Sequence, residues 1–123
     1  MNVVTMSGNL VSDPELRYTP QGTPVANFRI AVNSRFKNGS GELKEEVCYI
    51  DVTAFRAAEA IAEHLAKGRR VNIVGRLRYE TWQNSDGQTR SKHRILANQV
   101  EFLGGKPNGD APEKPAEDDE VPF

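Results

Sequence analysis

Residues 69–82, RRVNIVGRLRYETW, alternate between two kinds of side chain with the period of a β-strand. One parity is mostly apolar and comprises Val71, Ile73, Gly75, Leu77 and Tyr79. The other parity comprises Arg70, Asn72, Val74, Arg76, Arg78 and Trp82, which together supply three cations and one indole ring. Successive side chains of a strand point to opposite sides, so this run predicts a strand with a core face and a basic face. A basic face with an exposed ring suits a single nucleic-acid strand. The alternative is an ordinary solvated strand whose Trp82 folds under the sheet.

Four other stretches alternate in a similar way and predict strands over residues 2–11, 25–36, 46–55 and 90–103. In the first three, the positions expected to face the core are Val4, Met6, Gly8, Leu10, Ala26, Phe28, Ile30, Val32, Cys48, Ile50, Val52 and Ala54. In the last stretch, one face is expected to carry Leu96, Val100 and Phe102, and the other Ile95, Ala97 and Leu103. Turn chemistry rich in Pro, Gly and Asn separates the strands, with Arg17 and Tyr18 on a short connecting segment.

Only residues 57–67 have the period of a helix. Ala57, Ile61 and Leu65 recur at intervals of four, and Gly68 stands where a left-handed residue would end the helix. Three strands, one helix and two strands, in that order, are typical of a five-stranded OB barrel. The predicted fold class is therefore all-β with one helix, closed into such a barrel.

The net charge of −1 hides a strong asymmetry along the chain. Residues 1–105 hold 14 Lys and Arg against 11 Asp and Glu, a net charge of +3, whereas residues 106–123 hold 2 against 6, a net charge of −4. The second part is also rich in Pro and Gly without a hydrophobic period, which predicts a disordered acidic tail. We expect one domain over residues 1–105 with a polyanion as its partner, followed by a tail with a different role.

Several rings and cations fall on the predicted outer surface of the barrel. Tyr49 and Phe55 have the parity opposite to the core, and Trp82 shares its face with Arg78. Phe36 lies at the mouth of a hairpin and has core parity, so it could be either a core residue or a platform on which a base stacks. Rings on such a surface can stack unpaired bases of any sequence. The cations that could contact phosphates are Arg29, Arg35, Lys37, Arg56, Arg76, Arg78, Arg90, Lys92 and Arg94. Tyr79 and Phe102 are expected in the core or at a subunit interface, and Tyr18 is left undecided.

Enzymatic chemistry is the weakest interpretation of the sequence. His64 and His93 lack metal-ligand spacing, and the chain has neither a phosphate-binding loop nor a nucleophile motif, so no catalytic residue, metal or cofactor is expected. The single cysteine, Cys48, excludes an internal disulfide and is expected to pack as a small apolar residue. Without a signal peptide or a membrane-length apolar run, the expected location is the cytoplasm, with no membrane partner.

Most of the chain is similar to one known family. The matching stretches are GNLVSDPELRYTPQGTPVANFRIAV (8–32), VCYIDVTAF (47–55), LAKGRRVNIVGRLRYETW (65–82), SDGQTR (85–90), ANQVEFLGG (97–105) and DDEVPF (118–123). Together they resemble the bacterial single-stranded DNA-binding proteins, in the same order and spacing. The resemblance implies an OB fold, a homotetramer at the nucleoid, and sequence-independent binding of single-stranded DNA. It also implies stacking by Phe36, Tyr49, Phe55 and Trp82, of which Phe36 and Tyr49 replace residues that are often Trp in relatives.

The last six residues resemble the family's docking peptide. Asp118, Asp119, Glu120, Val121, Pro122 and Phe123 match it, with Val121 in place of the commoner Ile. The resemblance implies that this tip recruits replication, recombination and repair proteins. Residues 106–117 form a short linker whose r.m.s. reach as a flexible coil is only about 20 Å, too short to expect linker contacts between tetramers.

One alternative from another class stays open. The same OB barrel could be a protein-interaction module whose rings form subunit contacts. An unchanged gel-filtration position and unchanged Trp82 emission on addition of an oligonucleotide would favour that module over a DNA-binding protein.

Overall fold

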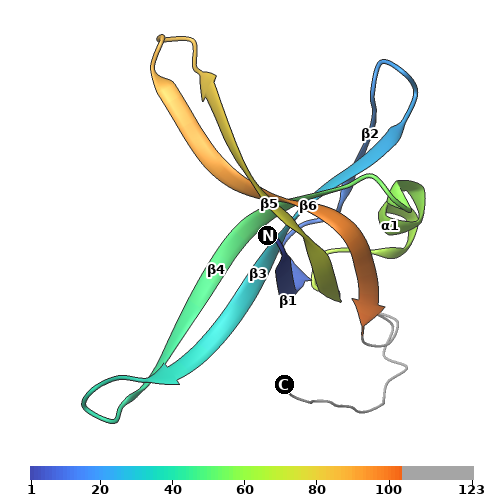
Figure 1. The fold of residues 1–123 in the computed structure, drawn as a ribbon. Helices are drawn as coiled ribbons and strands as arrows, with labels where there is room; N and C mark the ends of the chain where they lie inside the picture. Colours follow the sequence, from blue (N-terminus) through green and yellow to red (C-terminus); the bar gives the residue numbers. More distant parts are fainter. Residues whose placement is uncertain (104–123) are drawn as a thin grey trace.

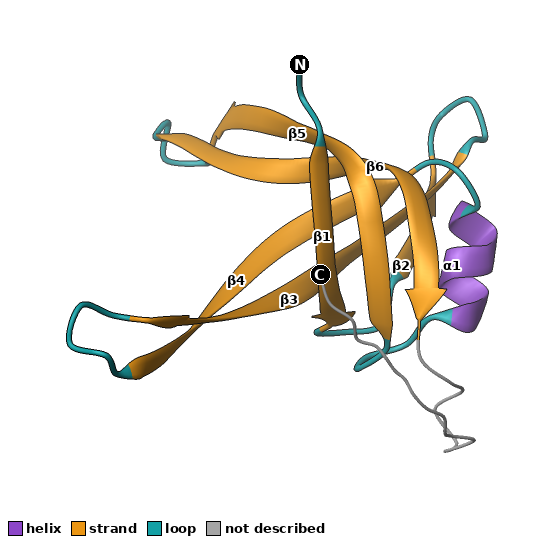
Figure 2. Ribbon diagram, turned by 60° about the horizontal axis from the view of Figure 1, so that its bottom comes forward, coloured by secondary structure: helices purple, strands orange, loops and turns teal. Residues whose placement is uncertain are grey.

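A computed structural model describes residues 1–103 as six strands and one helix (Figures 1 and 2). The elements are β1 (Val4–Leu10), β2 (Glu15–Tyr18), β3 (Pro24–Lys37), β4 (Leu43–Ala54), α1 (Ala58–His64), β5 (Arg70–Gln83) and β6 (Thr89–Leu103). The all-β fold with one helix between the third and fourth long strands is as predicted. The tail, with its expected docking residues 118–123, lies outside the described residues.

Five of the strands close into a barrel in the order β1-β5-β6-β4-β3. β1 closes the ring because it pairs with β5 along most of its length and with β3 at Asn9↔Ala31 and Leu10↔Ile30. Adjacent β4 and β6 run parallel, whereas the other pairs are antiparallel. The closed five-stranded OB barrel confirms the predicted fold class.

The sixth strand was not predicted. β2 pairs with the start of β3 from Glu15↔Asn27 to Tyr18↔Pro24, where the sequence indicated only a connecting segment. β1 meets β3 at only two residues, so the rest of the β3 edge offers backbone groups that an extended segment can satisfy. Four residues between two turns carry too little alternation to show this pairing in the sequence.

Alternating residues of the five strands fill the barrel. Ile30, Val52, Ile73 and Ile95 are fully buried, and Ile61 of α1 packs with them. The helix ends earlier than predicted, at His64, because Leu65 turns to extended backbone while its side chain stays in the core. Gly68 has the expected positive φ, 92°, but it lies in the turn that leads into β5 rather than directly after the helix.

A β-bulge in β6 overturns the predicted faces of residues 95–103. Val74 pairs with Gln99 whereas Gly75 pairs with Ala97, so Asn98 has no partner and the alternation shifts by one residue. Ile95 and Ala97 therefore share the barrel interior with Val100, while Leu96 and Leu103 face outward. Phe102 has the parity of Val100 but is 36% exposed, so it lies outside the core. Gly75 permits the bulge, since a Cβ there would lie 2.2 Å from the Leu96 carbonyl oxygen.

Two hairpin arms project from the barrel (Figure 1). We define the β3–β4 arm as residues 32–50 and the β5–β6 arm as residues 76–93, where each strand pairs only with its hairpin partner. Each tip is held by an asparagine: Asn38 Oδ1 accepts the Ser40 N–H at 2.9 Å, and Asn84 Oδ1 accepts the Asp86 N–H at 3.0 Å. Cys48 lies on the β3–β4 arm and is exposed, so its predicted place in the core is wrong.

Candidate nucleic-acid interface

One continuous surface runs across β3, β4, β6 and β5. Arg29, Asp51, Arg94 and Arg78 are direct cross-strand neighbours in these four strands, and such neighbours point to the same side of a sheet. We call this surface the outer face. It comprises the odd-numbered positions of residues 27–37 and 43–53 and the even-numbered positions of residues 76–82 and 90–96. It therefore extends from the barrel onto one side of each arm.

Two of the four predicted stacking rings lie on this surface, and a third follows the end of one of its strands. Tyr49 and Trp82 lie on the outer face of the two arms, and Phe55 directly follows β4 and has the same parity as Tyr49. Their exposed fractions are 56%, 46% and 48%. Trp82 does not fold under the sheet. Along an extended strand, Tyr49 and Phe55 are about 20 Å apart, a separation of several nucleotides rather than of adjacent bases.

Phe36 is placed differently. It is 43% exposed, so it is not part of the core, but it lies on the opposite side of the β3–β4 arm together with Val32 and Cys48. The structure thus places Tyr49 and Trp82 on the outer face, Phe55 directly after β4, and Phe36 on the other side of the β3–β4 arm.

Most of the predicted phosphate-contacting cations share the outer face. Those with exposed or half-exposed side chains there are Arg29, Arg35, Lys37, Arg76, Arg78, Arg90 and Lys92. Arg56 is also exposed, in the connection between β4 and α1. Arg94 differs from them, since it donates hydrogen bonds to Thr53 Oγ1 at 2.9 Å and to Glu80 Oε1 at 3.3 Å and is 21% exposed. Arg94 is therefore a structural cation of this surface.

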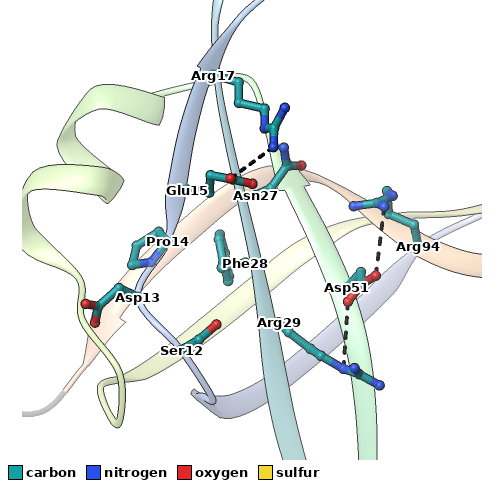
Figure 3. Close-up of a pocket in the computed structure, with 10 residues that line it drawn as sticks. All are labelled: Ser12, Asp13, Pro14, Glu15, Arg17, Asn27, Phe28, Arg29, Asp51 and Arg94. Atoms are coloured by element: carbon teal, nitrogen blue, oxygen red, sulfur yellow. Dashed lines mark hydrogen bonds and ion pairs between the residues drawn. The ribbon is translucent and has the colours of Figure 1, made fainter.

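Two carboxylates that form ion pairs with cations of this surface were missed from the sequence. Glu80 pairs with Arg94 and, at 3.9 Å, with Arg78. Asp51 lies 3.7 Å from Arg29 and 3.8 Å from Arg94 (Figure 3). The Lys92 ammonium group also contacts it. Only the register between strands distant in sequence brings these groups together, so the alternation of a single strand gives no signal for them.

An open groove of about 830 Å³ lies where the outer face meets β2 (Figure 3). Asn27, Asp51 and Arg94 line it from the sheet, and Glu15 and Arg17 line it from β2. The hydrogen bond from Arg17 to Glu15, 3.0 Å long, lowers the pKa of the Glu15 carboxyl and raises that of Arg17. Both groups therefore stay charged at neutral pH at the edge of the groove.

Comparison with known proteins identifies the family. The model of the single-strand binding protein family matches residues 1–103. The chain belongs to this family. A single-stranded DNA-binding protein of Helicobacter hepaticus is 46% identical over 110 residues, which cover 89% of this chain and 65% of that protein. The chain thus spans less than two thirds of the length of that relative.

Solved structures share the fold. A Plasmodium falciparum SSB in complex with ssDNA superposes with a TM-score of 0.79 at 24% identity, covering 84% of this chain and 95% of that one. A deletion mutant of the single-stranded DNA binding protein from Thermus aquaticus gives a TM-score of 0.76 at 30% identity, covering 85% of this chain and 51% of that one. Membership in a family of binding proteins agrees with the expectation that the chain is not an enzyme.

The two remaining exposed tyrosines of this family member lie elsewhere. Tyr79 is exposed on the other side of the β5–β6 arm, where it packs on His93 at a ring distance of 5.2 Å, so it is not in the core. Tyr18 donates a hydrogen bond to Glu59 at 3.1 Å, which ties β2 to α1 and raises the pKa of the phenol. Within residues 1–103, no helix is long and apolar enough to cross a membrane, and no cluster of His, Cys, Asp and Glu could hold a metal.

Proposed function

We propose that this protein binds single-stranded DNA without sequence preference along the outer face. The observation that carries the proposal is that two half-exposed rings, Tyr49 and Trp82, share the outer face with seven accessible cations, while a third half-exposed ring, Phe55, directly follows β4. The cations contact the phosphate backbone and the rings stack on bases. Membership in the single-strand binding protein family supports the same conclusion.

Physical chemistry explains both halves of this function. Large rings left in water mark a surface that binds a partner. A base stacked on such a ring gains roughly 1–3 kcal/mol whatever its identity, because every base has a π-face. Duplex DNA already stacks its bases internally, so the same rings cannot engage it. Selectivity for single strands therefore follows from the exposed rings, while the cations supply affinity that depends on salt.

Phe36 and Arg56 complete the proposed interface. A strand that passes over the edge of the β3–β4 arm would reach Phe36 on the other side, so we retain it as a fourth stacking residue. Arg56 adjoins Phe55 in sequence and would contact a phosphate beside that ring.

Titration with oligo(dT) tests the proposal. We expect Trp82 emission to fall on binding, and log K to fall linearly with log salt concentration with a slope near −0.7 per neutralised phosphate. A duplex of equal length should bind much more weakly. A signal independent of salt, a preference for duplex, or unchanged emission and gel-filtration position would contradict the proposal and favour the protein-interaction module.

The proposal extends to assembly and partners. We place the DNA-binding domain at residues 1–105 and the linker and tip at residues 106–123, in a cytoplasmic homotetramer that protects exposed DNA at the nucleoid. The exposed Leu77 and Tyr79, on the side of the β5–β6 arm away from the outer face, support a surface between subunits. Light scattering would measure the predicted fourfold mass, and a monomeric mass would contradict it.

The acidic tip recruits proteins of replication, recombination and repair in this proposal. Its support is the sequence DDEVPF, in which carboxylates can steer the peptide to a basic pocket and the apolar ending can fill it. Binding of such a protein should be lost when residues 118–123 are deleted, with oligo(dT) binding retained. Retained partner binding would assign recruitment to another surface. If the tip also competes with DNA for the basic surface, the deletion tightens oligo(dT) binding at low salt.

A further inference from the structure

Asp51 is an acidic residue at the centre of a surface that is otherwise rich in cations. Its carboxylate lies 3.7 Å from Arg29 Nε and 3.8 Å from Arg94 Nη2, and it contacts Lys92 Nζ directly. Arg29 comes from β3, and Arg94 and Lys92 come from β6; these two strands flank β4. Figure 3 shows Arg29 and Arg94 on either side of Asp51. One carboxylate therefore holds three cations where a DNA backbone would cross the sheet.

The three cations are not held equally. Arg94 is tied by its further hydrogen bonds to Thr53 and Glu80. The side chains of Arg29 and Lys92 are 55% and 39% exposed. Ion pairs with that much exposure to water are weak, so another anion can take over these two cations. Arg94 stays with the protein, whereas Arg29 and Lys92 can be exchanged.

Asp51 also influences a stacking ring. Arg29, which it holds, lies over the ring of Tyr49 with its guanidinium carbon 5.5 Å from the ring centre. Tyr49 and Asp51 are two residues apart on the same side of β4. The carboxylate therefore helps to keep a cation over one face of the ring where a base is proposed to stack.

We propose that Asp51 is an internal substitute for a DNA phosphate, which holds Arg29 and Lys92 in the free protein and releases them to the backbone on binding. The inference rests on the proposed function of the outer face. The hold of Asp51 on these cations lowers the affinity for DNA, because each transfer leaves the carboxylate uncompensated beside a phosphate of the same charge. The same hold lowers the salt dependence of DNA binding, because the two cations are already neutralised before DNA binds.

The test compares Asp51→Asn with Glu45→Gln in oligo(dT) titrations at several salt concentrations. Both variants remove one negative charge from the outer face of β4, but Glu45 has no ion pair within the described residues. We expect Asp51→Asn to bind about 3- to 10-fold more tightly at low salt, and its salt slope to steepen by about 0.7 for each cation set free. Glu45→Gln should change both quantities less.

The outcomes separate this inference from the proposed function. Wild-type protein that fails to bind oligo(dT) would overturn the proposed function. Wild-type binding with Asp51→Asn equal to Glu45→Gln would show a general charge effect and overturn only the role of Asp51. Weaker binding by a folded Asp51→Asn protein would overturn it too, since Asp51 would then position the cations without competing with phosphate.

A second pair of variants keeps the test independent of the folding of Asp51→Asn. Lys92→Gln and Arg90→Gln each remove one cation from the outer face of β6, but only Lys92 is paired with a carboxylate. Arg90→Gln should flatten the salt slope by about 0.7, the value for one phosphate contact. Lys92→Gln should flatten it clearly less, because Lys92 is already neutralised in the free protein. Equal flattening would contradict the substitution of Asp51 for a phosphate.

Discussion

The barrel and the two arms are built from the same strands, yet the alternation of apolar and polar residues has different consequences in each. In the barrel, five strands surround one interior, and Ile30, Val52 and Ile73 are fully buried. In the arms, two strands have no second layer to pack against, so apolar residues stay exposed on both sides, as Tyr79 and Trp82 do. The barrel therefore accounts for stability, and the arms supply exposed surface, which the proposed function uses for binding.

The largest effect should come from a glycine at the bulge of the barrel. Gly75→Ala places a Cβ 2.2 Å from the Leu96 carbonyl oxygen, a backbone atom that cannot turn away. We expect the free energy of unfolding to fall by about 1–3 kcal/mol or more. Urea unfolding followed by circular dichroism would measure it.

Gly39→Ala, at the tip of the β3–β4 arm, is the matched control. A Cβ at Gly39 meets nothing within 4 Å, and its φ is not in the left-handed region. Its free energy of unfolding should match that of the wild type. Equal losses for the two variants would show that barrel and arms do not differ in the way described.

The next effect concerns the arms. Trp82→Ala should weaken oligo(dT) binding roughly 5- to 150-fold, from the loss of one stacked base, with little change in the melting temperature. Thr81→Ala alters the neighbouring residue on the other side of the same arm and should bind like the wild type. Fluorescence anisotropy of a labelled oligonucleotide would compare them. An equal loss for both variants would indicate damage to the arm rather than loss of stacking.

A third comparison concerns two arginines of the outer face, Arg94, which stabilises the fold, and Arg76, which is proposed to contact DNA. Arg94→Gln removes hydrogen bonds to Thr53 and Glu80 and should lower the free energy of unfolding by about 1–2 kcal/mol. Arg76→Gln removes an exposed side chain, so it should preserve stability and flatten the salt slope of DNA binding by about 0.7. Thermal unfolding and salt titrations of both variants would reveal a reversed assignment, which would contradict this division.

The smallest effect belongs to the bond between β2 and α1. The hydrogen bond to Glu59 raises the pKa of Tyr18, so the folded state favours the protonated phenol. The stabilisation is therefore complete below the ordinary tyrosine pKa of about 10 and is lost as pH rises through the raised value. Tyr18→Phe should lower the melting temperature slightly at neutral pH and remove this part of its alkaline pH dependence. Tyr79→Phe, whose hydroxyl has no hydrogen bond within the described residues, should do neither.

The alternation of apolar and polar residues predicted the barrel well because one side of each barrel strand faces the same core. Val71, Ile73 and Gly75 are buried as their parity indicates. The prediction failed where alternation is interrupted or where the opposite layer ends. Asn98 shifts the pattern of β6, and neighbouring apolar residues on both sides of it conceal the shift. Cys48 continues the core parity of β4, but the barrel has ended by that point.

In the candidate site, too, some features could be predicted from single strands and others could not. The exposed rings Tyr49, Phe55 and Trp82 were visible from parity within single strands. The contacts of Asp51 with Arg29, Lys92 and Arg94 depend on the register of three strands, which no local pattern contains. The side of the arm on which Phe36 lies could be predicted, but its exposure depends on where the barrel ends.

Photocrosslinking tests the central claim most directly. A single strand carrying 5-iododeoxyuridine, bound to the full chain and irradiated, should crosslink to Tyr49, Phe55 and Trp82, as read by mass spectrometry of the digested protein. Crosslinks at Tyr79 with none on the outer face would contradict the account.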